Sequence, residues 1–378
     1  MSILRFSTQH LRNIFAGEEG EAKYKNFKKL TYDLAHGNDI YEYDENGEQR
    51  KISKKQANKA VRKVLLEVFE LTEEDLKSKK RRERAMELHR NEFFEIVESD
   101  VDFKVETAFQ EDEWFDQFVD MRNIALGDDE EFWTKEDVML VVAEVSGDHH
   151  DTTLQYAGAE TSHKIHTRKY AVAVGKDIDL IMLGRFDYTD MVDKIAQAYV
   201  YKIKELCFTG VYGAAKKLPN NTQFVKTGTL STGTKPQFDE LLEDVATANA
   251  ADVVIMGTKT ALKKLNALAD VDWRSSSQKE QVASTGRLGY YEGVELIEIP
   301  QRFAANDVTK KLIDNNVLLI FAKNQDKFVW FTDKGETQIV ESGTEKGQLA
   351  DDFQKYEVQR EMGCEVVLPR YFGQWSFT

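Results

Sequence analysis

A long stripe of apolar residues is the strongest pattern in the chain. Between residues 187 and 213, apolar side chains recur at steps of three and four, namely Tyr188, Val192, Ile195, Tyr199, Ile203 and Leu206. This spacing predicts a continuous apolar face along one long α-helix. Asp187 is the expected N-cap, and Gly210 and Gly213 are expected to mark the end. A second row, consisting of Met191, Ala198, Tyr201 and Phe208, predicts that more than one face is covered.

The chain before residue 136 has the pattern of short, densely charged helices. An amphipathic helix is predicted over 21–36 and ended by Gly37, and a hairpin is predicted around Asn46-Gly47. Ser53 is expected to cap a helix that runs to residue 69, and a capping box at 72–75 is expected to open another. That last helix carries the basic run KSKKRRER at 77–84. A solvated helix face is the expected role of this run, with contact to nucleic acid or an acidic partner as the alternative.

Strand patterns replace helical ones between residues 138 and 183. Three segments, 139–145, 168–174 and 177–183, are rich in β-branched or alternating apolar residues. The first two are separated by a polar stretch, 146–166. We therefore expect two extended arms joined by a polar tip, which project from a domain and lie on a neighbouring subunit.

The chain after the long helix has a mixed pattern that predicts a compact α/β domain. Helices are expected over 238–250 and 258–268, a fully buried strand over 252–256, and further strands over 294–299 and 317–321. Two further short strands, 328–331 and 337–340, are expected on either side of a turn at 333–335. Finally, 357–368 alternates over a length that matches the long helix, which predicts an elongated part beside the compact one.

Composition excludes several classes of protein. A hydrophobic content of 41% with 11% aromatic residues over 378 positions is typical of a folded chain with sizeable cores. The formal net charge of -15 argues against a dedicated nucleic-acid reader, because phosphate binding favours a basic surface. Two cysteines, Cys207 and Cys364, cannot form a disulfide framework and suit a reducing compartment. No apolar run reaches membrane-spanning length, and the first residues lack the apolar core of a signal peptide.

Candidate chemistry is sparse. His149, His150, His163 and His166 lie close in sequence beside acidic residues, and a hairpin could bring them together as metal ligands. No recognised zinc spacing accompanies them, and interface hydrogen bonding is the preferred interpretation. The segment 228–235, GTLSTGTK, lacks the lysine that directly follows the second glycine of a phosphate loop. We therefore assign no catalytic, cofactor-binding or metal-binding residue and expect that the protein is not an enzyme.

The order of these segments resembles that of tailed-bacteriophage major capsid proteins, which share the Hong Kong 97-type capsid fold. The resemblance covers about residues 110 to 378. It rests on the runs FVDMRNIALGD at 118–128, EVSGDHHDTTLQ at 144–155, RFDYTDMVDKI at 185–195 and MGCEVVLPRYFGQWSF at 362–377. The crosslink between a loop lysine and a neighbour's asparagine, found in some members, is not expected, because 345–378 contains no asparagine.

The resemblance implies an α+β fold with four parts. These are an N-terminal helical arm (1–137), a projecting extended loop (138–186), a peripheral domain with the spine helix (187–218 and 344–378) and an axial domain (219–343). The implied function is that of a major capsid protein that self-assembles, as hexamers and pentamers, into an icosahedral shell around the phage's double-stranded DNA. Expected partners are other copies of the chain, scaffold, portal and decoration proteins, and DNA held without sequence specificity, but no membrane. The expected location is the virion, after assembly in the host cytoplasm.

Two alternatives accompany this interpretation. An encapsulin-type nanocompartment shell shares the fold but encloses enzymes, and its subunits normally lack so long a charged arm. A metal-binding enzyme built on the histidine-rich stretch is the other. DNA-filled heads in electron micrographs would favour the capsid, and stoichiometric metal after dialysis would favour the enzyme.

Overall fold

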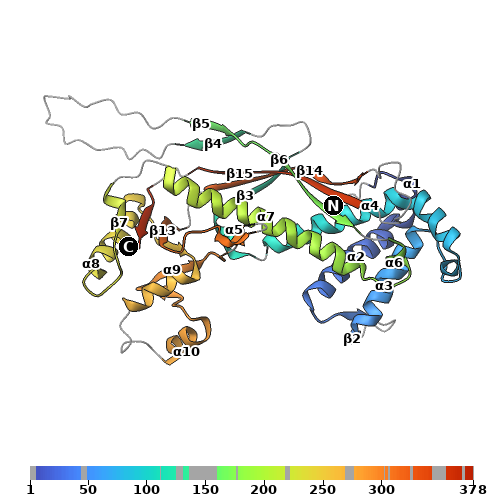
Figure 1. Ribbon diagram of the computed structural model, residues 1–378, viewed down its shortest axis with the longest axis horizontal. Coiled ribbons are helices and arrows are strands. Elements are labelled where there is room, and N and C mark those ends of the chain that lie inside the picture. The colour runs from blue at the N-terminus through green and yellow to red at the C-terminus, as the bar shows by residue number, and fades with distance from the viewer. Residues whose placement is uncertain are drawn as a thin grey trace. The chain divides into compact units, whose positions relative to one another are not determined.

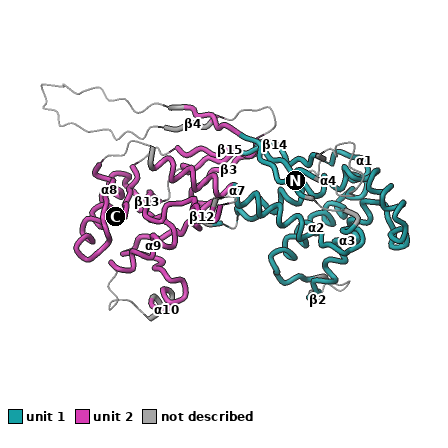
Figure 2. Tube along the Cα trace, viewed as in Figure 1, with its two compact units in different colours: residues 1–112, 168–202, 334–362 teal, residues 113–167, 203–333, 363–378 magenta. Residues whose placement is uncertain are grey.

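A computed structural model describes most of the chain and divides it into two compact units (Figure 2). The described residues are 6–43, 49–110, 112–124, 131–135, 160–175, 178–217, 222–268, 276–301, 303–304, 307–323, 327–342, 355–367 and 371–377. Unit 1 comprises 1–112, 168–202 and 334–362, and unit 2 comprises 113–167, 203–333 and 363–378. None of the helices that the structure describes combines the length and the apolar composition needed to span a membrane.

Unit 1 contains the helices of the arm (Figure 1). They are α1 (Gln9–Ile14), α2 (Gly17–His36), α3 (Lys54–Val68) and α4 (Lys79–Gln110), with the hairpin strands β1 (Tyr41–Tyr43) and β2 (Gln49–Lys51) between α2 and α3. Two predicted boundaries are confirmed: Gly37 ends α2 with φ of 70°, and Ser53 caps α3 in a capping box with Gln56. The box at Thr72 and Asp75 also forms, but it opens only the 3₁₀ turn η1 (Asp75–Lys77) before α4 begins.

The predicted long helix is α7 (Tyr188–Lys217). Five of the six stripe residues are buried; Leu206 is half-buried, and the neighbouring Cys207 is buried instead. In the second row, Phe208 is buried but Tyr201 is 54% exposed, so that row does not form a covered face throughout. Gly210 and Gly213 were expected to end the helix, and this was wrong, because both lie inside it.

The reason for the error at Gly210 is a close approach of two elements within unit 2. A Cβ added at Gly210 would lie 3.1 Å from Cγ2 of Val366 in strand β15 (Lys355–Val366), so the small residue serves packing and not helix termination. A Cβ at Gly213 would meet nothing within 4 Å.

The long strands form a four-stranded sheet with the order β3-β14-β15-β6. Strand β6 (Arg168–Gly175), predicted from its alternation, pairs antiparallel with β15 from Arg168↔Met362 to Gly175↔Lys355. Strand β3 (Val119–Ile124) follows the short helix α5 (Glu113–Phe118). Strand β14 (Val329–Ser342) is continuous, so the turn expected at 333–335 was wrong. Thr337 and Ile339 are held by hydrogen bonds from their hydroxyl and amide to Asp102 and Glu98 of α4, which keep the chain extended beyond Gly335.

Two predictions between residues 138 and 183 need correction. The segment 177–183 was expected to be a strand, but Ile178–Met182 form helix α6. A run this short fits either state by pattern alone, and here Ile181 and Met182 are buried while the Arg62 side chain donates to the Met182 carbonyl at 2.8 Å. The described hairpin strands are β4 (Glu131–Lys135) and β5 (Glu160–Lys164), and 168–174 is not one of the two arms, since it pairs with β15. The other expected arm, 139–145, lies outside the described residues.

Unit 2 is built on a six-stranded mixed sheet with the order β7-β16-β13-β8-β10-β9. Its strands are β7 (Val225–Thr227), β8 (Val253–Gly257), β9 (Tyr290–Tyr291), β10 (Val294–Glu298), β13 (Val317–Ala322) and β16 (Gly373–Ser376). Strands β8 and β10 are parallel, whereas β13 is antiparallel to both β8 and β16. The predicted strands 252–256, 294–299 and 317–321 are therefore confirmed in this sheet; β8 is fully buried, as expected, whereas β10 is mostly half-buried.

Helices pack on this sheet around one apolar core. Helices α8 (Lys235–Asn249) and α9 (Lys259–Lys264) match the predicted segments, and Thr258 caps α9 by accepting from the amide of Ala261. At the centre lies Trp375, which is fully buried and donates its Nε1 to the Gly228 carbonyl at 3.0 Å. The expected peripheral part included this C-terminal strand, but its pairing with β13 and β7 places it in the sheet of the axial elements.

The remaining elements are short. They are the 3₁₀ turns η2 (Thr222–Phe224) and η3 (Leu265–Ala267), helix α10 (Ser276–Thr285) and the two-stranded ribbon of β11 (Phe303–Ala304) and β12 (Asp307–Lys311).

The two glycines of α7 provide a matched test of the close approach to β15. Gly213→Ala should raise the free energy of unfolding by about 0.5–1 kcal/mol, because alanine is the better helix former and the space is open. Gly210→Ala should lose most or all of that gain, because its new methyl group must displace Val366. Urea denaturation of the unassembled chain measures both, and equal gains would mean that α7 and β15 do not approach this closely.

Candidate assembly site

The β4–β5 hairpin belongs to unit 2; β5 lies within the predicted projecting loop (138–186), whereas β4 precedes that range and falls in the predicted arm (1–137). Its register runs from Glu131↔Lys164 to Lys135↔Glu160, and Lys164 Nζ lies 3.5 Å from Glu131 Oε1 across the pair. Both of these side chains are largely exposed, so the ion pair adds little to stability. Of the hairpin side chains that the structure describes, Glu131, Ser162 and Lys164 are exposed.

The base of the hairpin rests directly on strand β15. Gly363 of β15 has no side chain because a Cβ there would lie 2.7 Å from Cγ2 of Ile165 and 2.8 Å from the carbonyl oxygen of His166. Residues 165–167 connect β5 to β6, so this contact fixes where the hairpin leaves unit 2. Any larger residue at Gly363 must push the connection away.

The predicted histidine cluster is only half described. The His163 ring lies with its centroid 5.9 Å from that of Trp330 in an edge-on arrangement, and His166 is exposed in the connection to β6. His149 and His150 lie outside the described residues. The two that are described are therefore in different surroundings, and whether the four residues come together stays untested.

The spine helix α7 packs on β15 within each unit. In unit 1, the Tyr199 hydroxyl, which is buried, donates to the carbonyl of Val358 at 2.5 Å. In unit 2, Sγ of Cys207 lies 3.7 Å from Sγ of Cys364, and both are free thiols. Burial beside the second thiol raises the pKa of Cys207, which keeps it protonated and unreactive. The two cysteines are thus neighbours that pack the helix against the strand.

The arm is tied to the first residue of the spine helix by aromatic rings. Tyr188 at the start of α7 lies with its ring centroid 6.0 Å from those of Phe27 in α2 and Phe93 in α4. Tyr24 then links Phe27 to Phe6 and Phe15 near the N-terminus, at centroid distances of 4.9 to 6.4 Å. All of these residues are buried. The arm therefore shares one apolar core with the spine helix in unit 1, as expected for an elaboration rather than a tethered domain.

Carboxylates on one face of α4 bind the long strands. Glu98 and Asp102 are one helical turn apart: Glu98 accepts from the amide of Ile339 at 2.5 Å, and Asp102 accepts from Thr337 at 2.5 Å. Arg360 of β15, which is 6% exposed, donates to the same oxygen of Asp102 at 2.9 Å. Burial raises the pKa of Glu98 to about 7, partly offset by the bond from Ile339.

A third carboxylate of α4, Asp100, is fully enclosed. Burial raises the pKa of Asp100 to about 6, while the ammonium of Lys104 and the hydroxyl of Thr31 favour its ionised form. Burial also lowers the pKa of Lys104, which is 2% exposed. Sequence reasoning missed this network, because the carboxylates of α4 stand in a densely charged helix where most side chains are solvated.

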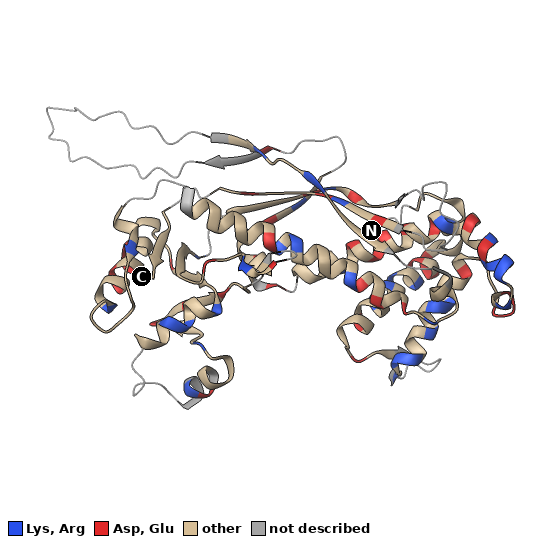
Figure 3. Ribbon diagram, viewed as in Figure 1, with Lys and Arg blue, Asp and Glu red and all other residues tan. Residues whose placement is uncertain are grey.

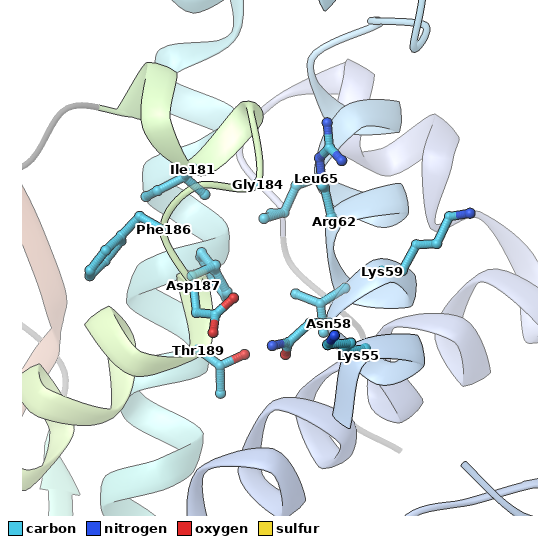
Figure 4. A pocket seen from close by; sticks show the side chains of 12 residues that line it. Lys55, Asn58, Lys59, Arg62, Leu65, Ile181, Gly184, Phe186, Asp187 and Thr189 are labelled. Carbon is cyan, nitrogen blue, oxygen red and sulfur yellow. The ribbon is translucent and has the colours of Figure 1, made fainter. Parts of the chain in front are cut away.

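A pocket opens beside the start of the spine helix in unit 1 (Figure 4). Lys55, Asn58 and Arg62 line it from α3, and they are faced by Asp187, just before α7, and by Thr189 in the first turn of α7. It contains a single carboxylate and no histidine or cysteine. This set lacks the pairing of a nucleophile or acid with a base that hydrolytic chemistry requires.

The two motifs considered for phosphate or nucleic-acid binding have internal partners. In the basic run, Arg82 is buried and donates to the Leu76 carbonyl, and Arg81 pairs with Asp75. Basic and acidic residues are interspersed along the arm helices (Figure 3). In 228–235, the Thr234 hydroxyl donates to the Thr229 carbonyl at 2.8 Å, and Lys235 forms an ion pair with Glu292. These contacts favour a solvated helix face for the basic run, and a loop held by its own hydrogen bonds for 228–235.

One group of potential metal ligands escaped sequence reasoning altogether. His10, Glu70 and His89 come from α1, the end of α3 and the middle of α4, and their nearest ligand atoms all lie within 4.8 Å of one another. His10 and Glu70 are 60 positions apart, and Glu70 and His89 are 19 apart. No known ligand motif has these spacings, so only the fold brings the three residues together.

Comparisons with known proteins point to one family. The profile of the family described as "SPbeta prophage-derived putative capsid protein YonB" matches residues 26–376. No curated protein matches the chain significantly.

Solved structures of phage capsids resemble the chain at low sequence identity. A Microbacterium phage Oxtober96 structure is 17% identical, with a TM-score of 0.44, and the match covers 68% of this chain and 89% of that one. The capsid of cyanophage P-SCSP1u is 15% identical, with a TM-score of 0.45 and coverage of 70% and 88%. The mature capsid of bacteriophage PhiM1 is 6% identical, with a TM-score of 0.48 and coverage of 68% of this chain and 85% of that one. Since the TM-scores are below 0.5, the family assignment rests on the profile match.

The raised pKa values of the α4 carboxylates predict a pH dependence of stability. Both groups have folded-state pKa values above their ordinary 4.5 and 3.8, so their contribution is complete below about pH 4 and is lost as the pH rises through 6 to 7. Unfolding of the unassembled chain should therefore require less urea at pH 8 than at pH 5.

Glu98→Gln isolates one of these groups, because the amide oxygen can still accept from Ile339. It should flatten the pH profile by about 1–2 kcal/mol, after allowance for the part of Glu98 that reaches solvent. Glu87→Gln, at an exposed position of the same helix, is the control and should leave the profile unchanged. A profile of Glu98→Gln that matches the wild type would show that Glu98 is ionised in the folded chain at neutral pH.

Proposed function

Because the chain belongs to the family of SPbeta prophage-derived capsid proteins, its role is structural, and we propose that it is the major capsid protein of a tailed phage. Copies of the chain associate as hexamers and pentamers and close into an icosahedral shell around double-stranded DNA. The observation that carries this proposal is the family match over 26–376, which includes the spine helix, both long strands, the hairpin and the six-stranded sheet.

The local geometry suits a shell subunit. A shell places many copies in nearly equivalent environments, so rigid cores must tile while an extended element reaches a neighbour. The apolar core around Trp375 and the aromatic core around Tyr188 supply rigid parts, and the β4–β5 hairpin supplies an extended two-stranded element. Pairing or docking on a second subunit would satisfy such a hairpin.

We also propose that the chain is divided into four functional parts. The arm (1–137), projecting loop (138–186), peripheral domain (187–218 and 344–378) and axial domain (219–343) are functional parts of a shell subunit, with β16 reassigned to the axial sheet. The arm is the least conventional part, and its packing on Tyr188 gives it the role of buttressing the spine helix.

Charge suits the proposed content of the shell. A net charge of -15 keeps packed DNA from adhering to the wall, because like charges repel across the inner surface. DNA would then be held without sequence specificity. Scaffold, portal and decoration proteins are the other expected partners, assembly takes place in the host cytoplasm, and the chain itself has no enzymatic role.

Electron microscopy tests this function directly. The expressed chain should form closed shells of uniform size, alone or with a co-expressed scaffold, and antibodies should label DNA-filled heads in phage lysates. An encapsulin would instead give tailless shells that enclose protein, an outcome that the prophage-derived family disfavours. Failure of the chain to appear in purified virions would contradict the proposal.

A substitution at the base of the hairpin tests how the shell closes. Gly363→Val should leave the chain soluble, with an unchanged circular dichroism spectrum, but should reduce the yield of closed shells at least tenfold. The added side chain displaces the 165–167 connection and re-aims the hairpin. Gly213→Ala, where a Cβ has open space, is the control and should assemble normally. If sedimentation shows wild-type yields of shells from Gly363→Val, the hairpin has no role in shell closure.

A further inference from the structure

A group of two imidazoles and one carboxylate lies at the junction of three arm helices in unit 1. His10 Nδ1 is 3.5 Å from Glu70 Oε1, His89 Nε2 is 3.8 Å from Glu70 Oε2, and the two rings have centroids 4.6 Å apart. We propose that His10, Glu70 and His89 bind a divalent transition-metal ion, with zinc as the best match, and that the ion staples α1 and α4 to the end of α3.

The spacing of these atoms fits a metal. Ligand atoms about 2.0–2.2 Å from a tetrahedral zinc ion lie roughly 3.3–3.6 Å from one another. The distances from the Glu70 carboxylate to the two imidazoles are close to this range, and the group as a whole spans no more than 4.8 Å. Small rotations of the side chains are enough to close it around an ion.

The hydrogen bonding of His10 prepares it as a ligand. Its Nε2 lies 2.9 Å from the carbonyl oxygen of Val68, the last residue of α3. A carbonyl only accepts, so Nε2 carries a proton, and the neutral form of this imidazole presents its Nδ1 lone pair on the side of Glu70. An outer hydrogen bond of this kind orients metal-binding histidines generally.

The surroundings of His89 also favour a ligand role. His89 is 14% exposed by its side chain, and its Nε2 is the ring nitrogen that lies near Glu70. The residue itself interrupts α4, with φ of −113° and ψ of 19°, so the helix bends at the point where the imidazole meets the group.

The backbone conformation of Glu70 is a third observation in favour of the site. Glu70 follows the C-cap of α3 and has φ of 51°, in the left-handed region where glycine is the usual residue. A glutamate there costs about 1 kcal/mol of strain relative to glycine. The strain is accounted for if the carboxylate has a function that glycine cannot supply.

The chemistry of these three ligands narrows the choice of metal ion. Imidazole suits zinc, copper, iron and nickel, while the hard ions calcium and magnesium prefer sets made of oxygen atoms. Three protein ligands leave a fourth position for water, and Glu70, which is 64% exposed, places that position on the solvent side. The simpler alternative is an ion pair between Glu70 and a protonated histidine, which predicts no stoichiometric binding of zinc or cobalt.

Metal binding is measured on the full chain after treatment with EDTA and gel filtration. Calorimetric titration should give about one Zn²⁺ per chain, and Co²⁺ should give the visible absorption of a four-coordinate site. Zinc should also raise the melting temperature by several degrees, because only the folded chain brings the ligands together. His10→Gln and His89→Gln should each weaken the affinity at least tenfold.

Controls separate this site from the other histidines. His36→Gln, in α2 of the same unit, and the quadruple His→Gln variant of His149, His150, His163 and His166 should both retain the binding. Loss of binding in the quadruple variant, with retention in His10→Gln and His89→Gln, would overturn the assignment. Absence of stoichiometric zinc or cobalt binding to the wild type would overturn it as well.

Glu70→Gly distinguishes a ligand from a merely structural residue. Relief of the left-handed backbone should raise the melting temperature of the metal-free chain, whereas the further rise on addition of zinc should shrink or disappear. A Glu70→Gly chain that still gains the full wild-type increase with zinc would exclude the carboxylate as a ligand.

Discussion

The packing of α7 against β15 is the contact on which both units depend. The helix is continuous from Tyr188 to Lys217 and the strand from Lys355 to Val366, and each contributes residues to both units. In unit 1 the buried Tyr199 hydroxyl reaches the Val358 carbonyl, and in unit 2 Gly210 and Cys207 let the strand approach closely. A helix has one fixed stripe of apolar positions, so a strand that follows it must keep the same face toward it over its whole length.

The carboxylates of α4 add a second constraint to unit 1. An apolar helix could slide along the edge of a sheet, but Glu98 and Asp102 accept from residues two apart on β14, and Arg360 fixes Asp102 from β15. Buried polar groups contribute little net stability, because desolvation offsets much of what the bonds return. Their effect is on register, since a shift of β14 by one residue would leave each of these groups unpaired. This explains why the strand passes through Asp333, Lys334 and Gly335 without turning, although those residues are typical of turns.

The sequence was most informative where local chemistry decides the structure. The stripe of α7, the capping box at Ser53, the stop at Gly37 and the buried strands of unit 2 follow from periodicity and backbone preference alone. The errors occurred where a tertiary contact overrides such preferences. Gly210 resembles a helix end but serves the approach of Val366, and 177–183 resembles a strand but folds as α6 beneath Arg62. Among candidate sites, the histidines that are neighbours in sequence drew attention, whereas His10, Glu70 and His89 are adjacent only in the folded chain.

The N-terminal part of the arm is held in place by tertiary contacts. The matching family profile begins at residue 26, yet Phe6 and Phe15 are buried against Tyr24 and so belong to the core that ends at Tyr188. The first helix is only six residues long, which is too short to be stable by itself. It must be held by tertiary contacts, and these are the aromatic cluster on one side and the junction of His10 with the end of α3 on the other. A metal ion at that junction would act at the point where the arm has least intrinsic stability. The same ion would thereby support Tyr188, and through it the first turn of the helix on which both units are built.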